Sequence, residues 1–541
     1  MSLACKAGCL HSKSPGSAQL PTRRSFFLAK GFRLKERAAP REARQTYLAA
    51  ARRSSAHRTY CQSGGGTSVS AREQGVEQAD APPSESAAPP VLPQNGAVSA
   101  AVRDSWVGHL LDTWADINAS PDTPELLQEL HEECGAALQS ARMPNTRVES
   151  FRFTDVSSII KSQPQVPEAA EGAARGMLSS HMLREDHELR AVIVDGCLDQ
   201  GLSNLSGLPD GVYIGSIRDA PEEVVAMRLG AQATTKGTPF TQVNGALAQD
   251  VVCIVLPPGA EVTQPLHLLH IASGREQSVS LNSPRLLIIL GRDAHLQILE
   301  EFCPLDSNQR ECYLTNATAE FELAEASSLQ HGYVNLESIA AWHVKSTLVN
   351  QAARSHYALT EANLGGRISR HDVVISQMGP ETETTMRNLQ VCGERQVHDL
   401  HSSLRLDHPS GRAQQLHKCI VASSTGRGVF DGNVQVNQKA QQTDAAQLSR
   451  NLLLAAKGAV FARPNLQIIA DDVSCTHGCT VSDLEEDQLF YFTTRGIGAE
   501  QARKILVYSF GKEITQGFRY PKLEARLEVA VNDLLSNAGA L

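Results

Sequence analysis

The sequence lacks the short motifs by which many enzymes are recognised. It contains no GxxxxGK[ST] phosphate-binding loop, no GxSxG nucleophile turn and no HExxH metal-binding helix. The glycine-rich stretch from Gly426 to Gly432 does not have the spacing of a nucleotide-binding loop, and its place among β-rich segments predicts a turn. We therefore expect that the chain does not bind ATP through a phosphate loop and is not an enzyme of these classes.

Long apolar runs and paired cysteines are also missing. No stretch approaches the roughly 18 apolar residues that a membrane helix requires, so we expect no membrane as a partner. The 12 cysteines are scattered without a CxxC pair. This distribution argues against a disulfide framework and favours free thiols in a reducing compartment.

Acidic residues are rare in the first 60 residues, which carry two of them against thirteen Lys and Arg and are rich in Ser and Ala. This composition predicts an organelle transit peptide over residues 1–60, with a basic disordered tail as the alternative. Gly, Pro, Ser and Glu dominate residues 61–98, which predicts a disordered linker. The leader contributes +11 to the net charge of −9, so the remainder is near −20. Such an acidic body disfavours nucleic acid as a partner.

Two amphipathic helices are predicted in an N-terminal helical region, residues 99–190. The first has apolar residues at positions i, i+3, i+4 and i+7 counted from Val107, which is one face of a helix. The second carries its apolar face from Leu127 onward. Thr123 and Pro124 before it predict an N-cap and a first helical residue.

Residues 191–482 change to short β-rich runs bounded by Gly and Pro, such as AVIVDG and PRLLIILG. Later units recur at irregular spacings of about 12 to 18 residues, which fits a sandwich, a barrel or a solenoid. A solenoid is favoured because each unit has too few apolar residues to form its own core, whereas stacked units bury a continuous one. The low aromatic content of 5% and the many Asn, Gln, Ser and Thr residues suit polar ladders on the outside of the stack.

Residues 483–541 are predicted to be a helical cover for the last rung, which would otherwise leave unpaired backbone groups. Ser482 and Glu485 have the spacing of a capping box and predict a helix start. A third helix begins at Pro521. The helix between them is predicted to bury one stripe: Ala502, Ile505, Leu506, Ser509 and Phe510.

A cluster of soft ligands, Cys475-Thr-His477-Gly-Cys479, stands at the end of the strand-rich region. Residues i, i+2 and i+4 of a strand share a face, so these three side chains would project together, with neighbouring Cβ atoms roughly 6.6 Å apart. That spacing is wide for three ligands of one zinc ion and suits a polynuclear cluster or a metal shared with a second chain. The alternative is two buried free cysteines and a structural histidine.

The segment from Ala470 to Ile497, ADDVSCTHGCTVSDLEEDQLFYFTTRGI, resembles the C-terminal signature of the SufB/SufD family of the SUF iron–sulfur assembly machinery. The likeness continues upstream through GVFDG, AQQTD and NLLL, and includes RVESFRFTDVSSI near the N-terminal helices. The chain sides with SufD, because Arg450 stands where SufB-like chains have a cysteine, and Thr476 and Gly478 stand where they have glutamates. Cys479 departs from the SufD pattern, so the resemblance assigns it no role.

The resemblance implies a mainly β fold, a right-handed parallel β-helix core flanked by N-terminal and C-terminal helical regions. It implies a non-catalytic subunit that pairs with SufB through its last strands and docks the SufC ATPase on its C-terminal helices, ATP being bound by SufC. His477 and Cys475 would lie at the SufB interface and share a metal or a transient iron–sulfur cluster with SufB. The expected location is the chloroplast stroma rather than the mitochondrion. A plain structural interaction module and a β-helix enzyme acting on polysaccharide are the alternatives.

Overall fold

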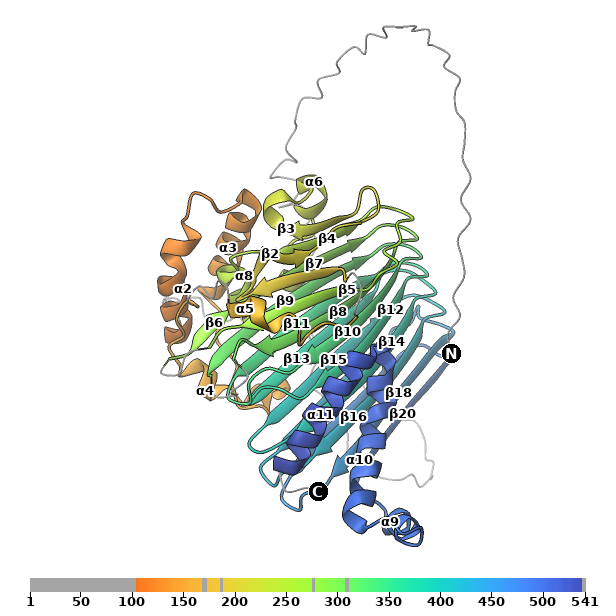
Figure 1. Cartoon of the computed structure of the whole chain (residues 1–541). Coiled ribbons are helices and arrows are strands. Elements are labelled where there is room, and N and C mark those ends of the chain that lie inside the picture. Colours follow the sequence, from red (N-terminus) through yellow and green to blue (C-terminus); the bar gives the residue numbers. More distant parts are fainter. Residues whose placement is uncertain (1–103, 168–172, 185–187, 275–277, 307–310, 538–541) are drawn as a thin grey trace, which may run out of the picture. The chain divides into compact units, whose positions relative to one another are not determined.

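The computed structural model describes residues 104–167, 173–184, 188–274, 278–306 and 311–537, which form stacked strands flanked by helices (Figure 1). The described strands are β1 (Arg190–Val194), β2 (Cys197–Asn204), β3 (Tyr213–Ser216), β4 (Val252–Leu256), β5 (Leu266–Ala272), β6 (Ser280–Asn282), β7 (Arg285–Leu290), β8 (His295–Pro304), β9 (Tyr313–Leu323), β10 (Ser328–Asn335), β11 (Trp342–Gln351), β12 (His356–Asn363), β13 (Ile368–Gln377), β14 (Glu383–Cys392), β15 (Val397–Leu406), β16 (Arg412–Val421), β17 (Arg427–Val436), β18 (Thr443–Leu453), β19 (Ala459–Ile468) and β20 (Val473–Ser482).

The described helices are α2 (Ser105–Asn118), α3 (Glu125–Leu138), α4 (Ser157–Ile160), α5 (Ala173–Met177), α6 (Glu222–Val225), α7 (Ala231–Lys236), α8 (Pro239–Leu247), α9 (Glu486–Thr493), α10 (Ala499–Thr515) and α11 (Pro521–Asn537). None of the helices in these described ranges is both long and apolar enough to cross a membrane. The predicted transit peptide and linker lie outside the described residues.

The strands form two sheets that face each other. Sheet 1 has the order β2-β1-β5-β8-β10-β12-β14-β16-β18-β20, and sheet 2 has the order β19-β17-β15-β13-β11-β9-β7-β4-β3, with β6 paired to β9. From β8 and β9 onward, successive strands alternate between the sheets and pair in parallel without a change of register. This is the pattern of a chain that winds through stacked rungs. The predicted parallel β-helix with helices at both ends is confirmed, and the sandwich is excluded.

The interior is apolar over most of its length but contains buried polar ladders. Glu300 lies inside, with Lys345 Nζ 2.8 Å and His331 Nε2 2.7 Å from its carboxylate. Burial favours the protonated acid, but the neighbouring Lys345 and histidines outweigh it and hold the pKa of Glu300 well below its ordinary value. Gln415 and Gln447 are also buried and hydrogen-bonded to each other. The expectation that polar ladders lie on the outside is wrong for these residues, because facing rungs satisfy them inside.

The predicted N-terminal helices correspond to α2 and α3, which bury their apolar faces against α8 and sheet 2. Asp104 caps α2, its side chain accepting a hydrogen bond from the Trp106 amide at 3.0 Å. The predicted N-cap of α3 is wrong by one residue: Pro124 precedes the first helical residue, Glu125, and no side chain caps the helix. Proline lacks an amide hydrogen in any case, so this start leaves one donor fewer to satisfy.

The C-terminal helices α10 and α11 cover the outer face of sheet 1 (Figure 1). The predicted capping box is wrong, because Ser482 ends strand β20 and α9 starts at Glu486 without a side-chain cap. Helix α11 starts at Pro521 as predicted. Helix α10 buries Ala502 but otherwise not the predicted stripe. Its buried residues are Ala502, Val507, Gly511, Ile514 and Thr515, which reflects the face that lies on β12, β14 and β16.

Candidate functional site at the open end of the solenoid

Strands β19 and β20 are the last strands of their sheets among the described residues, and each has a paired neighbour on one side only. Their residues are half-buried or exposed throughout, whereas alternate residues of β18, one rung inward, are buried. Pro464 lies in β19, a position that suits an edge strand because proline cannot donate to a ladder. We call this last rung, β19 with β20, the open end.

The soft-ligand cluster lies on β20. Cys475, His477 and Cys479 pair in register with Ala445, Gln447 and Ser449 of β18, whose side chains are buried inside the solenoid. The three side chains therefore share the face that continues the interior, as the strand spacing predicts. They lie where the interior of the solenoid opens at its last rung, which we call the mouth, and no further described rung follows them.

The two thiols of this cluster have different surroundings. Cys475 is half-buried and packs against the main hydrophobic core together with Leu466 and Val473. Burial raises the pKa of the Cys475 thiol above its ordinary value, and the carboxylate of Asp444 raises it further, although a backbone hydrogen bond opposes the shift. Cys479 is exposed, because it lies beyond the reach of that core cluster.

The floor of the mouth contains two buried polar side chains that the sequence reasoning missed. Gln447 is 1% exposed, and its Nε2 atom donates to Gln415 Oε1 at 2.9 Å, but its own Oε1 atom has no partner. Asn451 is 2% exposed; its Nδ2 atom donates to Thr480 O at 2.9 Å, and its Oδ1 atom has no partner. The signal was available in the alternation of β18, where both residues occupy inward positions.

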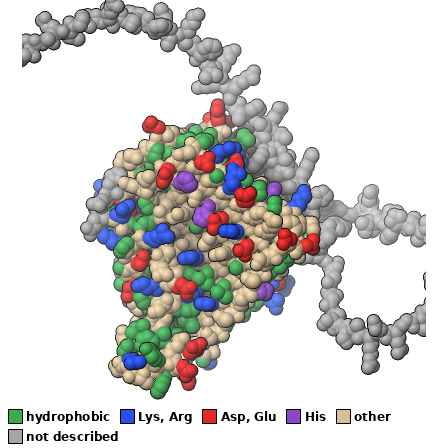
Figure 2. Space-filling model, turned by 90° about the vertical axis from the view of Figure 1, so that its right-hand side faces the viewer, with side chains coloured by type: hydrophobic (Ala, Val, Ile, Leu, Met, Phe, Trp, Pro, Cys, Tyr) green, Lys and Arg blue, Asp and Glu red, His purple; other side chains and the backbone are tan. Residues whose placement is uncertain are grey.

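Large apolar side chains are exposed around the open end. They are Ile468, Ile469 and Val481 of the last rung, 46%, 51% and 49% exposed, and Phe490 and Tyr491 of α9, 69% and 58% exposed. Figure 2 shows hydrophobic side chains gathered at the lower end of the face it presents, the level at which Figure 1 places α9. Helix α9 buries no residue within the described chain. Exposed apolar side chains next to a sheet edge are typical of a protein–protein interface.

Across the described ranges, no group of three or more His, Cys, Asp or Glu side chains is arranged to hold a metal ion. The side chains of the mouth are spread along one strand rather than converging on a point. A metal bound at the open end would therefore need further ligands from outside the described residues.

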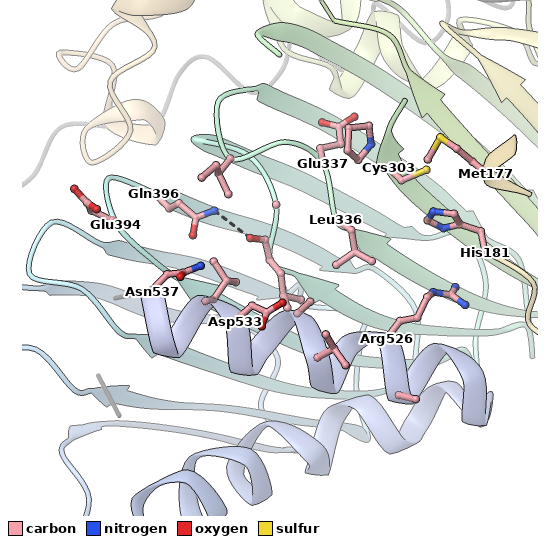
Figure 3. Close-up of a pocket in the computed structure, with 18 residues that line it drawn as sticks. Met177, His181, Cys303, Leu336, Glu337, Glu394, Gln396, Arg526, Asp533 and Asn537 are labelled. Carbon is pink, nitrogen blue, oxygen red and sulfur yellow. Dashed lines mark hydrogen bonds between the residues drawn. The ribbon is translucent and has the colours of Figure 1, made fainter. Parts of the chain in front are cut away.

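A separate groove of about 880 Å³ lies between α11 and the loops that follow β8, β10, β12 and β14 (Figure 3). Polar groups on its walls bond to one another. Arg526 and His181 both contact the Glu301 carboxylate, at 2.8 Å each, and Gln396 Nε2 donates to Leu364 O at 3.0 Å. Because these groups are already paired with one another, they reflect how α11 packs on the loops.

Comparisons with known proteins place the chain in a family. The family model described as "SUF system FeS cluster assembly, SufBD core domain" matches residues 270–510, and the model "SufBD protein N-terminal region" matches residues 115–268.

Three relatives cover most of the chain. The chloroplastic protein ABCI7 of Arabidopsis thaliana is 40% identical over 435 residues, which is 79% of this chain and 90% of that protein. An iron–sulfur cluster assembly SufBD family protein of Synechocystis is 34% identical, covering 74% of this chain and 89% of the relative. The iron–sulfur cluster assembly protein SufD of Escherichia coli is 28% identical, covering 73% and 89%. The chain belongs to the SufBD family of iron–sulfur cluster assembly proteins.

Proposed function

We propose that this chain is a SufD-type, non-catalytic subunit that pairs with a SufB-type chain through its open end and helps to assemble iron–sulfur clusters there. The observation that carries the proposal is the open end itself. Strands β19 and β20 offer an uncovered sheet edge, flanked by the exposed apolar side chains of Ile468, Ile469 and Val481. A second solenoid with a similar edge would satisfy the backbone groups and bury these side chains at the same time.

A second partner, the SufC ATPase, would bind the C-terminal helices. Phe490 and Tyr491 on α9 supply exposed apolar area for such contact. Helix α10 is also tied to the solenoid, because Lys418 of β16 donates to the carbonyl oxygen of Phe510 at 2.8 Å and pairs with Glu513. A force applied to α10 by an ATP-driven partner would thus reach β16, two strands from the mouth. ATP would be bound by SufC, not by this chain.

Iron and sulfide are the cargo of the proposed complex. His477 would lie in the closed interface and hold or receive the nascent cluster together with SufB ligands, and Cys475 would lie at the same interface two residues away. Imidazole nitrogen and thiolate sulfur both suit iron, and a closed interface excludes water and oxidants. His477 is exposed in the single chain, so it is available to a partner. It could act as an iron ligand or orient a ligand of SufB by hydrogen bonding.

We further propose that the protein works in the plastid stroma. The basic, acid-poor composition of residues 1–60 is that of a transit peptide, and the relative in Arabidopsis thaliana is described as chloroplastic. Import of the full chain fused to a fluorescent protein would distinguish plastid from mitochondrial targeting.

The alternatives predict different behaviour. A plain interaction module would form the complex but would not need His477. A polysaccharide-active β-helix would need convergent carboxylates on an exposed groove, whereas Glu301, beside the groove described above, is paired with Arg526 and His181. The family relationship favours assembly over both.

The test is anaerobic co-expression of the full chain with SufB-type and SufC-type subunits, followed by measurement of iron and acid-labile sulfide. We expect a stable ternary complex that carries labile sulfide, and loss of that sulfide in His477→Ala without dissociation. His295→Ala is the matched control, because His295 is also exposed on a strand of sheet 1 but lies far from the open end in strand order. If His477→Ala retained its sulfide, the interaction module would be the better description; if no complex formed, the proposal would fail.

A further inference from the structure

Two thiols flank His477 at the same spacing, yet only one is presented to a partner. Cys475 and Cys479 are each two residues from His477 on the same face of β20. Cys475 packs against the core with Leu466 and Val473, whereas Cys479 is exposed. A thiol must reach the metal and lose its proton to bind it, and both steps favour an exposed position over a packed one.

The neighbours of the two thiols differ in the same way. Cys475 pairs in register with Ala445 and packs on the apolar core. Cys479 pairs in register with Ser449, a neutral residue whose hydroxyl oxygen interacts with His417 Nδ1 at 3.1 Å and accepts from Asn451 Nδ2 at 3.1 Å. The Cys479 thiol therefore lies over polar residues and, unlike Cys475, does not pack against the hydrophobic core.

The floor beneath His477 and Cys479 carries an independent sign of a missing polar partner. Gln447, the register partner of His477, donates from its Nε2 atom to Gln415 on β16, and its buried Oε1 atom has no partner. Asn451, the register partner of Val481 two residues beyond Cys479, likewise has a buried, unpartnered Oδ1 atom. Buried acceptors without partners are uncommon in native proteins, and each can receive a hydrogen bond from a group placed next to it.

These atoms define a chemical arrangement. A carbonyl oxygen beneath His477 can accept the N–H of one ring nitrogen, which fixes the tautomer and leaves the other nitrogen free to bind a metal. Residues two apart on a strand have Cβ atoms roughly 6.6 Å apart. Imidazole and thiolate side chains, with metal bonds of about 2.0–2.3 Å, can span that distance to reach one ion.

We propose that Cys479, not Cys475, is the thiol ligand that works beside His477, so that this chain offers an adjacent nitrogen and sulfur pair to one iron of the cluster. Cys475 then serves the packing of the last rung. The inference rests on the proposed function, because the remaining ligands must come from the partner across the open end.

The first experiment uses the full chain alone, reduced and anaerobic, and follows alkylation by iodoacetamide with mass spectrometry. We expect Cys479 to react faster than Cys475 by roughly tenfold or more. Equal rates, or faster alkylation of Cys475, would overturn the inference at its geometric basis.

The second experiment uses the ternary complex loaded with iron and sulfide and compares Cys479→Ser, Cys475→Ser and Cys479→His. We expect Cys479→Ser to lose most of its labile sulfide and its thiolate-to-iron charge-transfer absorption while the complex stays intact. Cys475→Ser should match the parent, and Cys479→His, which restores a metal ligand, should recover part of the iron. Thermal unfolding of each variant alone separates loss of a ligand from loss of the fold.

The outcomes separate this inference from the function on which it rests. If the parent complex formed and Cys475→Ser lost the cluster while Cys479→Ser kept it, the proposed function would stand and the assignment of the thiol would be wrong. If both variants kept the cluster, no thiol of this strand would be a ligand. If the parent chain formed no complex, both proposals would fall together.

Discussion

The two ends of the solenoid are finished in opposite ways. At the first end, β1 pairs antiparallel with β2 and β3 pairs antiparallel with β4, so that both sheets begin with a reversed strand. Leu205, Leu208 and Val212, from the segment between β2 and β3, pack against the interior core there. At the open end the parallel stack stops at β19 and β20, whose faces remain largely exposed.

The two ends differ in how well their sheet edges are protected against pairing with another strand. A reversed strand and a plug of apolar side chains shield a sheet from further pairing, which is how natural proteins manage their edges. The open end has no such plug among the described residues, and instead presents cysteine, histidine and apolar side chains. A solenoid whose edges are protected at one end and exposed at the other fits the interface that we propose at the open end.

The strongest test of the comparison places a charge in the interior and at the mouth. Ile288 of β7 is buried in the interior core, whereas Val481 of β20 is 49% exposed. Ile288→Glu buries an unpaired carboxylate and should cost more than about 4 kcal/mol of unfolding free energy. Val481→Glu should cost less than about 0.5 kcal/mol in the single chain and still abolish pairing with a SufB-type partner. Urea unfolding and co-purification measure the two effects. Equal destabilisation would show that the open end is part of the folded core.

A second test compares glycines at the two depths. A Cβ atom on Gly428 would lie 2.3 Å from the Sγ atom of the fully buried Cys419, whereas on Gly478 it would lie 3.1 Å from the end of the Leu448 side chain. Gly428→Ala should cost about 1–3 kcal/mol of unfolding free energy through overpacking. Gly478→Ala should stay within about 0.5 kcal/mol of the parent, because Gly478 is only half-buried and the flexible end of the Leu448 side chain can move aside.

The double variant Gly428→Ala with Cys419→Ala provides the control for that test. Removal of the sulfur should restore part of the lost stability, which a thermodynamic cycle would record as a favourable coupling. If the second substitution added its own cost without any rescue, the steric explanation would be wrong.

A third test asks how far the dry interior extends toward the mouth. His417 of β16, two strands from β20, is fully buried and stacked on Phe430, and burial lowers its pKa to about 3 despite the opposing Glu361 carboxylate. The unfolded chain takes up this proton near pH 6.5, so the stability contributed by neutral His417 is present above that pH and is lost as the pH falls toward 3.

Between pH 7 and pH 5 the unfolding free energy of the parent should therefore fall by about 2 kcal/mol more than that of His417→Gln. Denaturation curves of both proteins at the two pH values measure the difference. Parallel pH dependence would mean that water reaches His417 and that the interior is wet two strands below the mouth.

Sequence reasoning reached the architecture because its signals are local and repeated. Short strands with too few apolar residues predict stacking, and the helical spacing from Val107 predicts the buried face of α2, which contains Val107, Leu110 and Trp114. Strand alternation also places Cys475, His477 and Cys479 on one face. Each of these conclusions needs only the period of one element.

The wrong predictions have a common cause. How deeply a residue is buried depends on neighbours that are far away in sequence. The predicted capping box at Ser482 does not form, because β20 extends to Ser482, which pairs with Leu452 of β18. The buried face of α10 depends on which strands lie under it. The contrast between Cys475 and Cys479 depends on where the core cluster ends along the rung, which strand alternation does not encode.

The in-register ladder of parallel strands has a kinetic consequence. Each inner rung is held by neighbours on both sides, whereas β20 is held only by β18. A stack with nearest-neighbour coupling frays from its unprotected terminus, so amide hydrogens should exchange fastest in β20 and progressively more slowly toward the middle of the stack. Docking of another strand against β20 would convert that terminus into an inner rung and erase the gradient. The exchange rates of the β20 amide hydrogens would thus show whether a partner strand is bound at this edge.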